Sequence, residues 1–161
     1  MNPTIDAHTF RAVLGRFATG VTVVTARDDE GHDHGMTVSA FCSVSLEPPL
    51  VLTCLDRAAT LLPRLAQGAT FAVNVLSSSQ EALSRRFASE VDDRFDGVGY
   101  TRGPLGSPLL DEALAYLECR IESMVDAGDH VIIIARVEHT HVSEDADPLL
   151  YYRSGYGRLV R

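Results

Sequence analysis

The feature that most constrains the fold is a pair of long strand-like runs joined by a tight turn. The runs are "ALAYLECRIESMV" (113–125) and "HVIIIARVEHTHV" (130–142), and "DAGD" lies between them. β-Branched residues favour strands, and a short turn that contains Asp and Gly between two such runs is a strong hairpin signal. A hairpin of this length predicts an antiparallel sheet as the framework of the fold.

Four further runs have the composition of strands: "GVTVVTA" (20–26), "GMTVSAFCSVSL" (35–46), "LVLTCL" (50–55) and "FAVNVL" (71–76). The tail "DPLLYYRSGYGRL" predicts one more short strand, whereas the segment 92–108 is expected to be irregular. Strands dominate and no βαβ alternation recurs. We therefore expect a mainly β fold, a closed antiparallel barrel with peripheral helices, in a single domain of residues 1–161.

The predicted helices are few and short. The first helix carries apolar residues at positions i, i+3, i+4 and i+7, which places them on one face: Phe10, Val13, Leu14 and Phe17. A second helix is expected after the loop that follows residue 56, with Thr60 as its N-cap and Pro63 in its first turn. Ser79 is expected to cap a third helix that runs to about Ala88.

The composition is ordinary for a globular chain, but the charge narrows the range of partners. The chain has 161 residues, of which 45% are hydrophobic and 22% charged, and its net charge is −8. Such a charge opposes binding to nucleic acid or to anionic membranes. No stretch approaches the ~18 apolar residues of a membrane span. We expect small molecules or proteins as partners, with no nucleic acid and no membrane.

The cysteines and the N-terminus both indicate a cytoplasmic location. Cys42, Cys54 and Cys119 are odd in number, far apart and set in apolar runs, so buried free thiols in a reducing compartment are expected. The first residues, "MNPTIDAHTFRAV", lack the apolar run of a signal peptide.

Residues 35–46 would have an unusual face if they formed one continuous strand. Alternate residues point to opposite sides of a strand, so Thr37, Ser39, Ser43 and Ser45 would surround Phe41 on a face without charge. Such a face is either exposed to solvent or borders a polar, planar ligand. Where a neighbouring strand is missing, the strand's own N–H and C=O groups also serve the ligand.

Two segments offer cations beside expected helices. In "LDRAATLLPR" (55–64), the free N–H groups of a helix N-terminus would suit an anion, with Arg57 adding a charge and Thr60 a hydroxyl. In "LSRRFA" (83–88), Arg85 and Arg86 form a further cationic pair. An ordinary capped helix and a solvated helix face are the alternatives.

His130 lies where the tight turn enters a very apolar strand, directly after Asp129. Neighbours on a strand point to opposite faces, so the sequence does not establish a direct pair between them. The alternative is a histidine that only closes the turn.

Signatures of other site classes are missing. His32 and His34 share a face, as do His139 and His141, but neither pair has a Cys or carboxylate at a recognised ligand spacing, so no metal site is expected. The sequence also contains no GxGxxG, P-loop or GxSxG motif. A Rossmann dinucleotide site, a nucleotide triphosphatase and a common hydrolase therefore lack support.

Taken together, six blocks resemble the short-chain flavin reductase family, the reductase components of two-component flavin monooxygenases. They occur in family order over about residues 8 to 159. The blocks are "RFATGVTVVTA", "GMTVSAFCSVSLEPPLVL", "FAVNVLSSSQEALSRRFA", "ALAYLECRI", "GDHVIIIARV" and "PLLYYRSGYGRL".

The resemblance implies a fold and a function. The fold is a split β-barrel of Greek-key antiparallel topology, assembled as a homodimer, that binds FMN or FAD without a Rossmann domain. The function is NAD(P)H:flavin oxidoreductase activity, with NADH or NADPH as hydride donor and reduced flavin released to a partner oxygenase. The flavin itself carries the hydride chemistry, so no acid, base or nucleophile triad is expected.

The resemblance also implies where the flavin binds. The segment Met36–Ala40 would run along the flavin ring, and the flavin phosphate would lie near Ala59, Thr60 and Arg86. Arg94 is expected in the pocket as well. The expected cofactor-binding residues are Met36, Thr37, Val38, Ser39, Ala40, Ser45, Cys54, Ala59, Thr60, Arg86, Phe87 and Phe95.

For the nicotinamide, the resemblance implies His130 as the catalytic, positioning residue, with Tyr152 in the same region. Three alternatives remain at this stage. The flavin could be a tightly held prosthetic group; the protein could be a flavin-binding module for storage or regulation without reductase activity; or the histidines could hold a metal.

Overall fold

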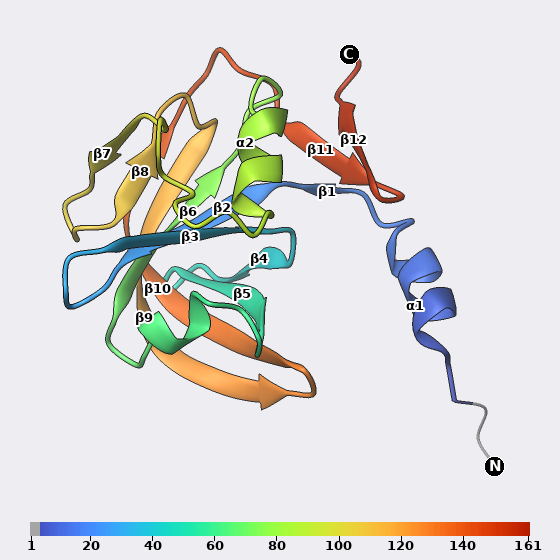
Figure 1. Ribbon diagram of the computed structural model, residues 1–161, viewed down its shortest axis with the longest axis horizontal. Coiled ribbons are helices and arrows are strands. Elements are labelled where there is room, and N and C mark those ends of the chain that lie inside the picture. Colours follow the sequence, from blue (N-terminus) through green and yellow to red (C-terminus); the bar gives the residue numbers. More distant parts are fainter. Residues whose placement is uncertain (1–3) are drawn as a thin grey trace.

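The structure, a computed structural model, describes residues 4–161, which form an antiparallel barrel with small peripheral elements (Figure 1). The helices are α1 (Ala7–Leu14), the 3₁₀ helix η1 (Leu62–Arg64) and α2 (Glu81–Phe87). The strands are β1 (Thr19–Gly20), β2 (Thr22–Arg27), β3 (Asp33–Val38), β4 (Phe41–Ser45), β5 (Leu50–Asp56), β6 (Thr70–Val75), β7 (Tyr100–Arg102), β8 (Pro108–Leu110), β9 (Ala115–Ala127), β10 (His130–Val142), β11 (Leu149–Tyr152) and β12 (Gly155–Arg158).

Seven strands form one sheet in the order β3-β2-β6-β9-β10-β5-β4, and every neighbouring pair is antiparallel. β3 and β4 stand at opposite ends of this order, yet only Ser39 and Ala40 separate them along the chain. Three residue steps span at most ~11 Å, so the two edges must lie close together. The sheet therefore rolls into a barrel that is split between β3 and β4, which confirms the predicted fold class.

The predicted hairpin is the longest element of the barrel. β9 and β10 pair from His130↔Ala127 to Val142↔Ala115, with two register irregularities. The turn consists of Gly128 and Asp129, and Gly128 adopts φ 63°, a conformation that costs glycine little. The hairpin prediction is confirmed almost to the residue.

Four predictions of secondary structure are wrong. Ser79 does not cap α2, whose N-cap is Gln80 and has no side-chain cap hydrogen bond. The run 35–46 is two strands, because the chain leaves one edge of the sheet at Ser39 and joins the other. The segment 92–108 is not wholly irregular, since β7 pairs with β8. The expected helix after residue 56 is only the short 3₁₀ helix η1, and Thr60 does not cap it.

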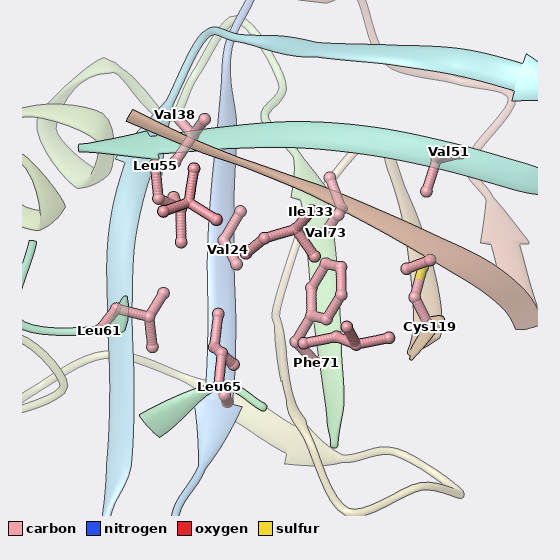
Figure 2. Close-up of a cluster of buried hydrophobic side chains, with 14 residues drawn as sticks. Val24, Val38, Val51, Leu55, Leu61, Leu65, Phe71, Val73, Cys119 and Ile133 are labelled. Carbon is pink, nitrogen blue, oxygen red and sulfur yellow. The ribbon is translucent and has the colours of Figure 1, made fainter. Parts of the chain in front are cut away.

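Two hydrophobic clusters hold the barrel and its cover together. Val24, Phe71 and Ile133 belong to the cluster inside the barrel (Figure 2). Val23 and Phe87 belong to a second cluster, which packs beneath α2. β2 contributes to both clusters, so both of its faces are buried. This double burial explains why the run 20–26 shows no alternation of apolar and charged residues.

Asn74 links three strands from a fully buried position. Its Nδ2 donates to the Val23 carbonyl at 3.0 Å, and its Oδ1 accepts from the Leu110 N–H at 2.9 Å. Asn74→Leu leaves the buried Leu110 N–H without this partner, so the free energy of unfolding should fall by about 1–3 kcal/mol. Urea denaturation measures this loss. A change below about 0.5 kcal/mol would show that Asn74 does not organise the strands.

α1 stands away from the barrel (Figure 1) and buries none of its residues. Asp6 caps it by accepting from the Thr9 N–H at 2.9 Å. The apolar face predicted from the spacing exists, but it is exposed: Phe10 57%, Val13 63%, Leu14 51% and Phe17 77%. Among residues 4–161, no helix is both long enough and apolar enough to pass through a membrane.

Candidate functional site

A cleft of about 550 Å³ lies between β3, the segment after β5 and the loop that follows α2. Its walls are Asp33–Met36, Ala58–Thr60 and Glu90–Phe95. The volume suits a small organic ligand. The cleft is therefore built where three segments that are distant in the sequence converge.

Four of the expected flavin residues line this cleft: Met36, Ala59, Thr60 and Phe95. Arg94 lines it as well, and its guanidinium donates to the Gly35 carbonyl at 2.7 Å. The structure thus brings together expected residues from three segments that are far apart in the sequence.

The break between β3 and β4 changes the face expected for residues 35–46. Thr37 donates its hydroxyl to the Ser84 carbonyl at 2.6 Å, which ties β3 to α2, and Val38 is buried in the barrel core. Ser39 and Ala40 are exposed at the break, and Ser45 ends β4 at the edge of the sheet. The expected continuous hydroxyl face is therefore wrong, and the carbonyls at the break accept from the Phe41 and Cys54 N–H groups.

The cysteines are free, but they are not all buried. Cys42 is exposed on β4, which contradicts the expectation for that thiol. Cys54 is half-buried on β5, and its pKa is raised by burial and then by the neighbouring Cys42. Burial raises the pKa of Cys119 to about 12. Cys54, an expected flavin contact, does not line the cleft.

The expected anion site at a helix N-terminus is absent from the segment after β5. Asp56 accepts from the Ala58 N–H at 2.8 Å through its side chain and from the Ala59 N–H at 3.0 Å through its carbonyl. Arg57 pairs with Asp126 at 2.8 Å, so its charge is directed to the β9–β10 hairpin. Of the residues expected near the anion in this segment, Ala59 and Thr60 line the cleft, whereas Arg57 does not.

Arg86 organises the loop that forms the third wall. Its Nε donates to the Arg94 carbonyl at 2.7 Å and its Nη2 to the Asp93 carbonyl at 2.9 Å. Arg86 itself does not line the cleft. These bonds leave Nη1 as the nitrogen that could meet an anion, and they give Arg86 a structural role that the sequence did not indicate.

Aromatic side chains pack behind the wall of the cleft that Phe95 forms. Phe87 is fully buried, so it differs from the expectation of direct flavin contact, and it meets Phe95 edge-on with ring centroids 5.0 Å apart. Phe95 in turn meets Tyr100 at 5.2 Å. A Cβ at Gly35 would lie 2.8 Å from the Phe87 ring, so glycine is required there for this packing.

Asp33 was missed by sequence reasoning and lines the cleft. It accepts from the Tyr100 hydroxyl at 2.7 Å and from Arg102 Nη1 at 2.6 Å. Burial alone would raise the pKa of Asp33, but the bonds from Arg102 and Tyr100 bring it below the usual value. The charged carboxylate therefore anchors the aromatic wall. No local motif marks this partnership, because its members are far apart in the sequence.

His130 forms the pair that the sequence left open. Its Nδ1 lies 2.7 Å from Asp129 Oδ1, and the hydrogen bond lowers the pKa of Asp129. His130 pairs with Asp56 across the sheet, and the Asp129 carbonyl accepts from the Arg57 N–H at 2.9 Å. The hairpin end therefore lies beside the segment that continues into the cleft wall at Ala58.

Tyr152 belongs to the separate sheet β1-β11-β12, at the side where α1 leaves the barrel (Figure 1). Its side chain is exposed. Within one chain, the two residues expected at the nicotinamide thus come from different sheets.

The turn between β2 and β3 gathers donors that sequence reasoning did not connect. Ligand atoms of Asp28, Glu30 and His32 lie within 4.8 Å of one another, a proximity that the sequence spacing did not indicate. Asp28 is already engaged: Oδ1 accepts from the Glu30 and His32 N–H groups, and Oδ2 lies 2.7 Å from His34 Nε2. The pKa of Asp28 is lowered to about 2, and the largest cause is the hydrogen bond with His34.

The same fold and sequence pattern occur in known proteins. The flavin reductase like domain matches residues 14–160. A flavin reductase from Pseudomonas putida is 44% identical over 95% of this chain and 90% of its own length. The reductase subunit HsaB of a flavin-dependent monooxygenase from Rhodococcus jostii is 41% identical over 94% of this chain and 77% of its own length.

Solved structures agree with these sequences. The NADH:FAD oxidoreductase SgcE6 from Streptomyces globisporus, solved with NAD and FAD fragments, has a TM-score of 0.90 and 38% identity. The match covers 98% of this chain and 97% of that one. From its barrel, its cleft and these similarities, the chain belongs to the flavin reductase like domain family.

Proposed function

We propose that the protein is an NAD(P)H:flavin oxidoreductase that reduces FMN, with FAD as a second flavin, and supplies the reduced flavin to a partner monooxygenase. The observation that carries this proposal is the cleft between β3, Ala58–Thr60 and the loop Glu90–Phe95. The relatives named above are flavin reductases or reductase subunits. The three free cysteines fit a reducing cytoplasm.

The residues of the cleft fit a flavin. Met36 and Phe95 offer apolar surface to a planar ring, and Thr60 offers a hydroxyl to a phosphate. The exposed break at Ser39 and Ala40 follows β3, and because both carbonyls there are already hydrogen-bonded, the N–H groups of these residues would meet the polar edge of the ring. When bound, the flavin supplies the chemistry by accepting a hydride from the reduced nicotinamide.

The protein's own contribution is positioning. Phe87 and Tyr100 fix the ring of Phe95, and Arg86 holds the loop. His130, oriented by Asp129, would place the nicotinamide against the flavin, with Tyr152 supplied from the other sheet. Hydride transfer depends steeply on distance and angle, so these residues would raise the rate by orienting the nicotinamide against the flavin.

We further propose a homodimer with two flavin sites near the interface. α1 carries Phe10, Val13 and Leu14, the turn after it carries Phe17, and all four side chains are exposed. An exposed apolar face of this kind marks an interaction surface. We propose that a second copy of the chain covers this apolar face, because the nicotinamide site supports such a partner. His130 and Tyr152 lie on separate sheets within one chain, and a partner barrel can bring such elements together.

The function is tested by following NADH oxidation by the purified protein with and without added flavin. Stimulation by free FMN is the expected result. Saturable flavin binding without NADH oxidation would instead identify a binding module for storage or regulation. Crossing NADH and NADPH with FMN, FAD and riboflavin separates the remaining options, including a flavin that stays bound as a prosthetic group.

Thr60 gives a test of the phosphate position. Thr60→Ala should weaken FMN binding by about 1 kcal/mol, as for the loss of one hydrogen bond, and leave riboflavin binding unchanged because riboflavin has no phosphate. Fluorescence titration of both flavins measures this difference. Thr101→Ala, an exposed threonine on β7, is the matched control. Equal losses for FMN and riboflavin would move Thr60 away from the phosphate.

A further inference from the structure

The third wall of the cleft, Glu90–Phe95, is acidic. It carries the carboxylates of Glu90, Asp92 and Asp93 against a single guanidinium, that of Arg94. The three acidic residues are exposed, and none of the ion pairs within residues 4–161 includes any of them. Their negative charges therefore border the cleft without a cation paired to them.

Hydrogen bonds hold this acidic wall in place. Arg86 Nε donates to the Arg94 carbonyl at 2.7 Å, and Arg86 Nη2 donates to the Asp93 carbonyl at 2.9 Å. Arg94 Nε donates to the Ser89 carbonyl at 2.9 Å, and Arg94 Nη1 donates to the Gly35 carbonyl at 2.7 Å. Moving the wall away from the cleft would break several of these bonds, so the carboxylates stay beside the ligand space.

The other walls do not add to this negative charge. Asp33 Oδ1 lies 2.6 Å from Arg102 Nη1, and Asp33 Oδ2 accepts from the Tyr100 hydroxyl at 2.7 Å, so its charge is offset. The segment Ala58–Thr60 has no charged side chain. The uncompensated negative charge of the cleft is therefore concentrated on the acidic wall.

A flavin changes its charge when it is reduced. Adding a hydride, which is a proton with two electrons, to the neutral oxidised ring gives an anion whose charge lies near N1 and O2. Like charges repel more strongly in a cleft with low-dielectric walls than in bulk water. The phosphate of FMN is present in both redox states, so the acidic wall distinguishes them through the ring.

We propose that Glu90 and Asp92, together with Asp93, make the cleft hold reduced flavin more weakly than oxidised flavin. The inference rests on the proposed function, because it takes this cleft as the flavin site. Repulsion from the acidic wall favours release of the flavin after hydride transfer. The flavin is then a substrate that leaves the protein, as a partner monooxygenase requires, and not a prosthetic group.

The test measures the affinity of both redox states of riboflavin, which lacks the phosphate. Glu90→Gln combined with Asp92→Asn removes two charges and keeps the size of both side chains. Asp93 is left unchanged, because its Oδ1 accepts from the Phe95 N–H at 3.0 Å. At low ionic strength in mildly alkaline buffer, this double variant should bind reduced riboflavin about 10-fold more tightly than the wild type.

The affinity for oxidised riboflavin should not change, because the oxidised ring is neutral. The midpoint potential of bound riboflavin should therefore rise by about 30 mV, the equivalent of a 10-fold change for two electrons. At about 1 M salt, where the screening length is about 3 Å, the difference should disappear. Glu144→Gln combined with Asp145→Asn is the matched control, since it removes two charges from exposed residues outside the cleft.

The outcome is independent of NADH, because affinities and potential are measured by anaerobic titration with a chemical reductant. Redox-dependent binding that responds to the double variant as stated supports the inference even if the wild type does not oxidise NADH, which would remove only the reductase function. An unchanged ratio of the two affinities in the double variant overturns the inference. An equal change in both affinities also overturns it and assigns Glu90 and Asp92 to the shape of the loop.

Discussion

Phe10→Glu combined with Val13→Glu is expected to convert the protein into a monomer. Both side chains lie on α1 and are more than half exposed in a single chain. Burying such side chains against a partner contributes about 1.5–3 kcal/mol each. Their loss should therefore raise the dissociation constant of the dimer by about two to four orders of magnitude. Light scattering over a concentration series measures the change.

The variant should remain folded, because α1 contributes no buried residue to its own barrel. The barrel should keep its secondary structure, while flavin reduction falls together with the fraction of dimer. Val160→Glu, which alters another exposed apolar residue away from α1, is the control and should stay dimeric. A wild-type protein that is monomeric with flavin bound would refute the proposed assembly.

Local sequence predicted the strands of the barrel well, because their determinants are local. β10 was predicted at its observed bounds, since the run from His130 to Val142 is β-branched and enters from a tight turn. The resemblance to flavin reductases supplied the topology, and the similar sequences and structures confirm the family. The order of the strands could not come from periodicity alone, because it depends on pairings such as β2 with β6.

The break at Ser39 and Ala40 shows why the strand containing the site was misjudged. Apolar and polar residues alternate straight through the break, so the pattern fits one strand as well as two. What ends β3 is the closure of the barrel, which pairs Phe41 with Thr53 of β5 at the other edge. Closure of the barrel depends on the whole sheet, so it cannot be predicted from a stretch of ten residues.

Residues of the site were found where the resemblance to the family implied them and missed where a distant partner defined them. Thr60 and Phe95 belong to the first group and line the cleft. Asp33 belongs to the second, because its role depends on Tyr100 and Arg102, both far along the chain. Arg86 was expected to act through its charge alone, and its bonds to loop carbonyls emerged only with the loop in place.

His130→Ala is expected to slow the reduction of flavin by NADH without weakening flavin binding. In the structure, the imidazole Nδ1 lies 2.7 Å from Asp129 Oδ1, and this hydrogen bond lowers the pKa of the Asp129 carboxyl. A side chain held in this way orients a neighbour and needs no proton transfer of its own. We expect kcat/KM for NADH to fall roughly 10- to 100-fold, or about 1.4 to 2.8 kcal/mol of transition-state stabilisation.

Stopped-flow reduction of bound FMN, beside a titration of FMN with the same variant, separates the possible roles of His130. His139→Ala, which removes an exposed histidine from the same strand, is the matched control and should behave as the wild type. Weaker FMN binding with an unchanged reduction rate would move His130 to the flavin. If neither quantity changes, the pair with Asp129 serves only to close the hairpin, and nicotinamide positioning must depend on Tyr152 and the groups around it.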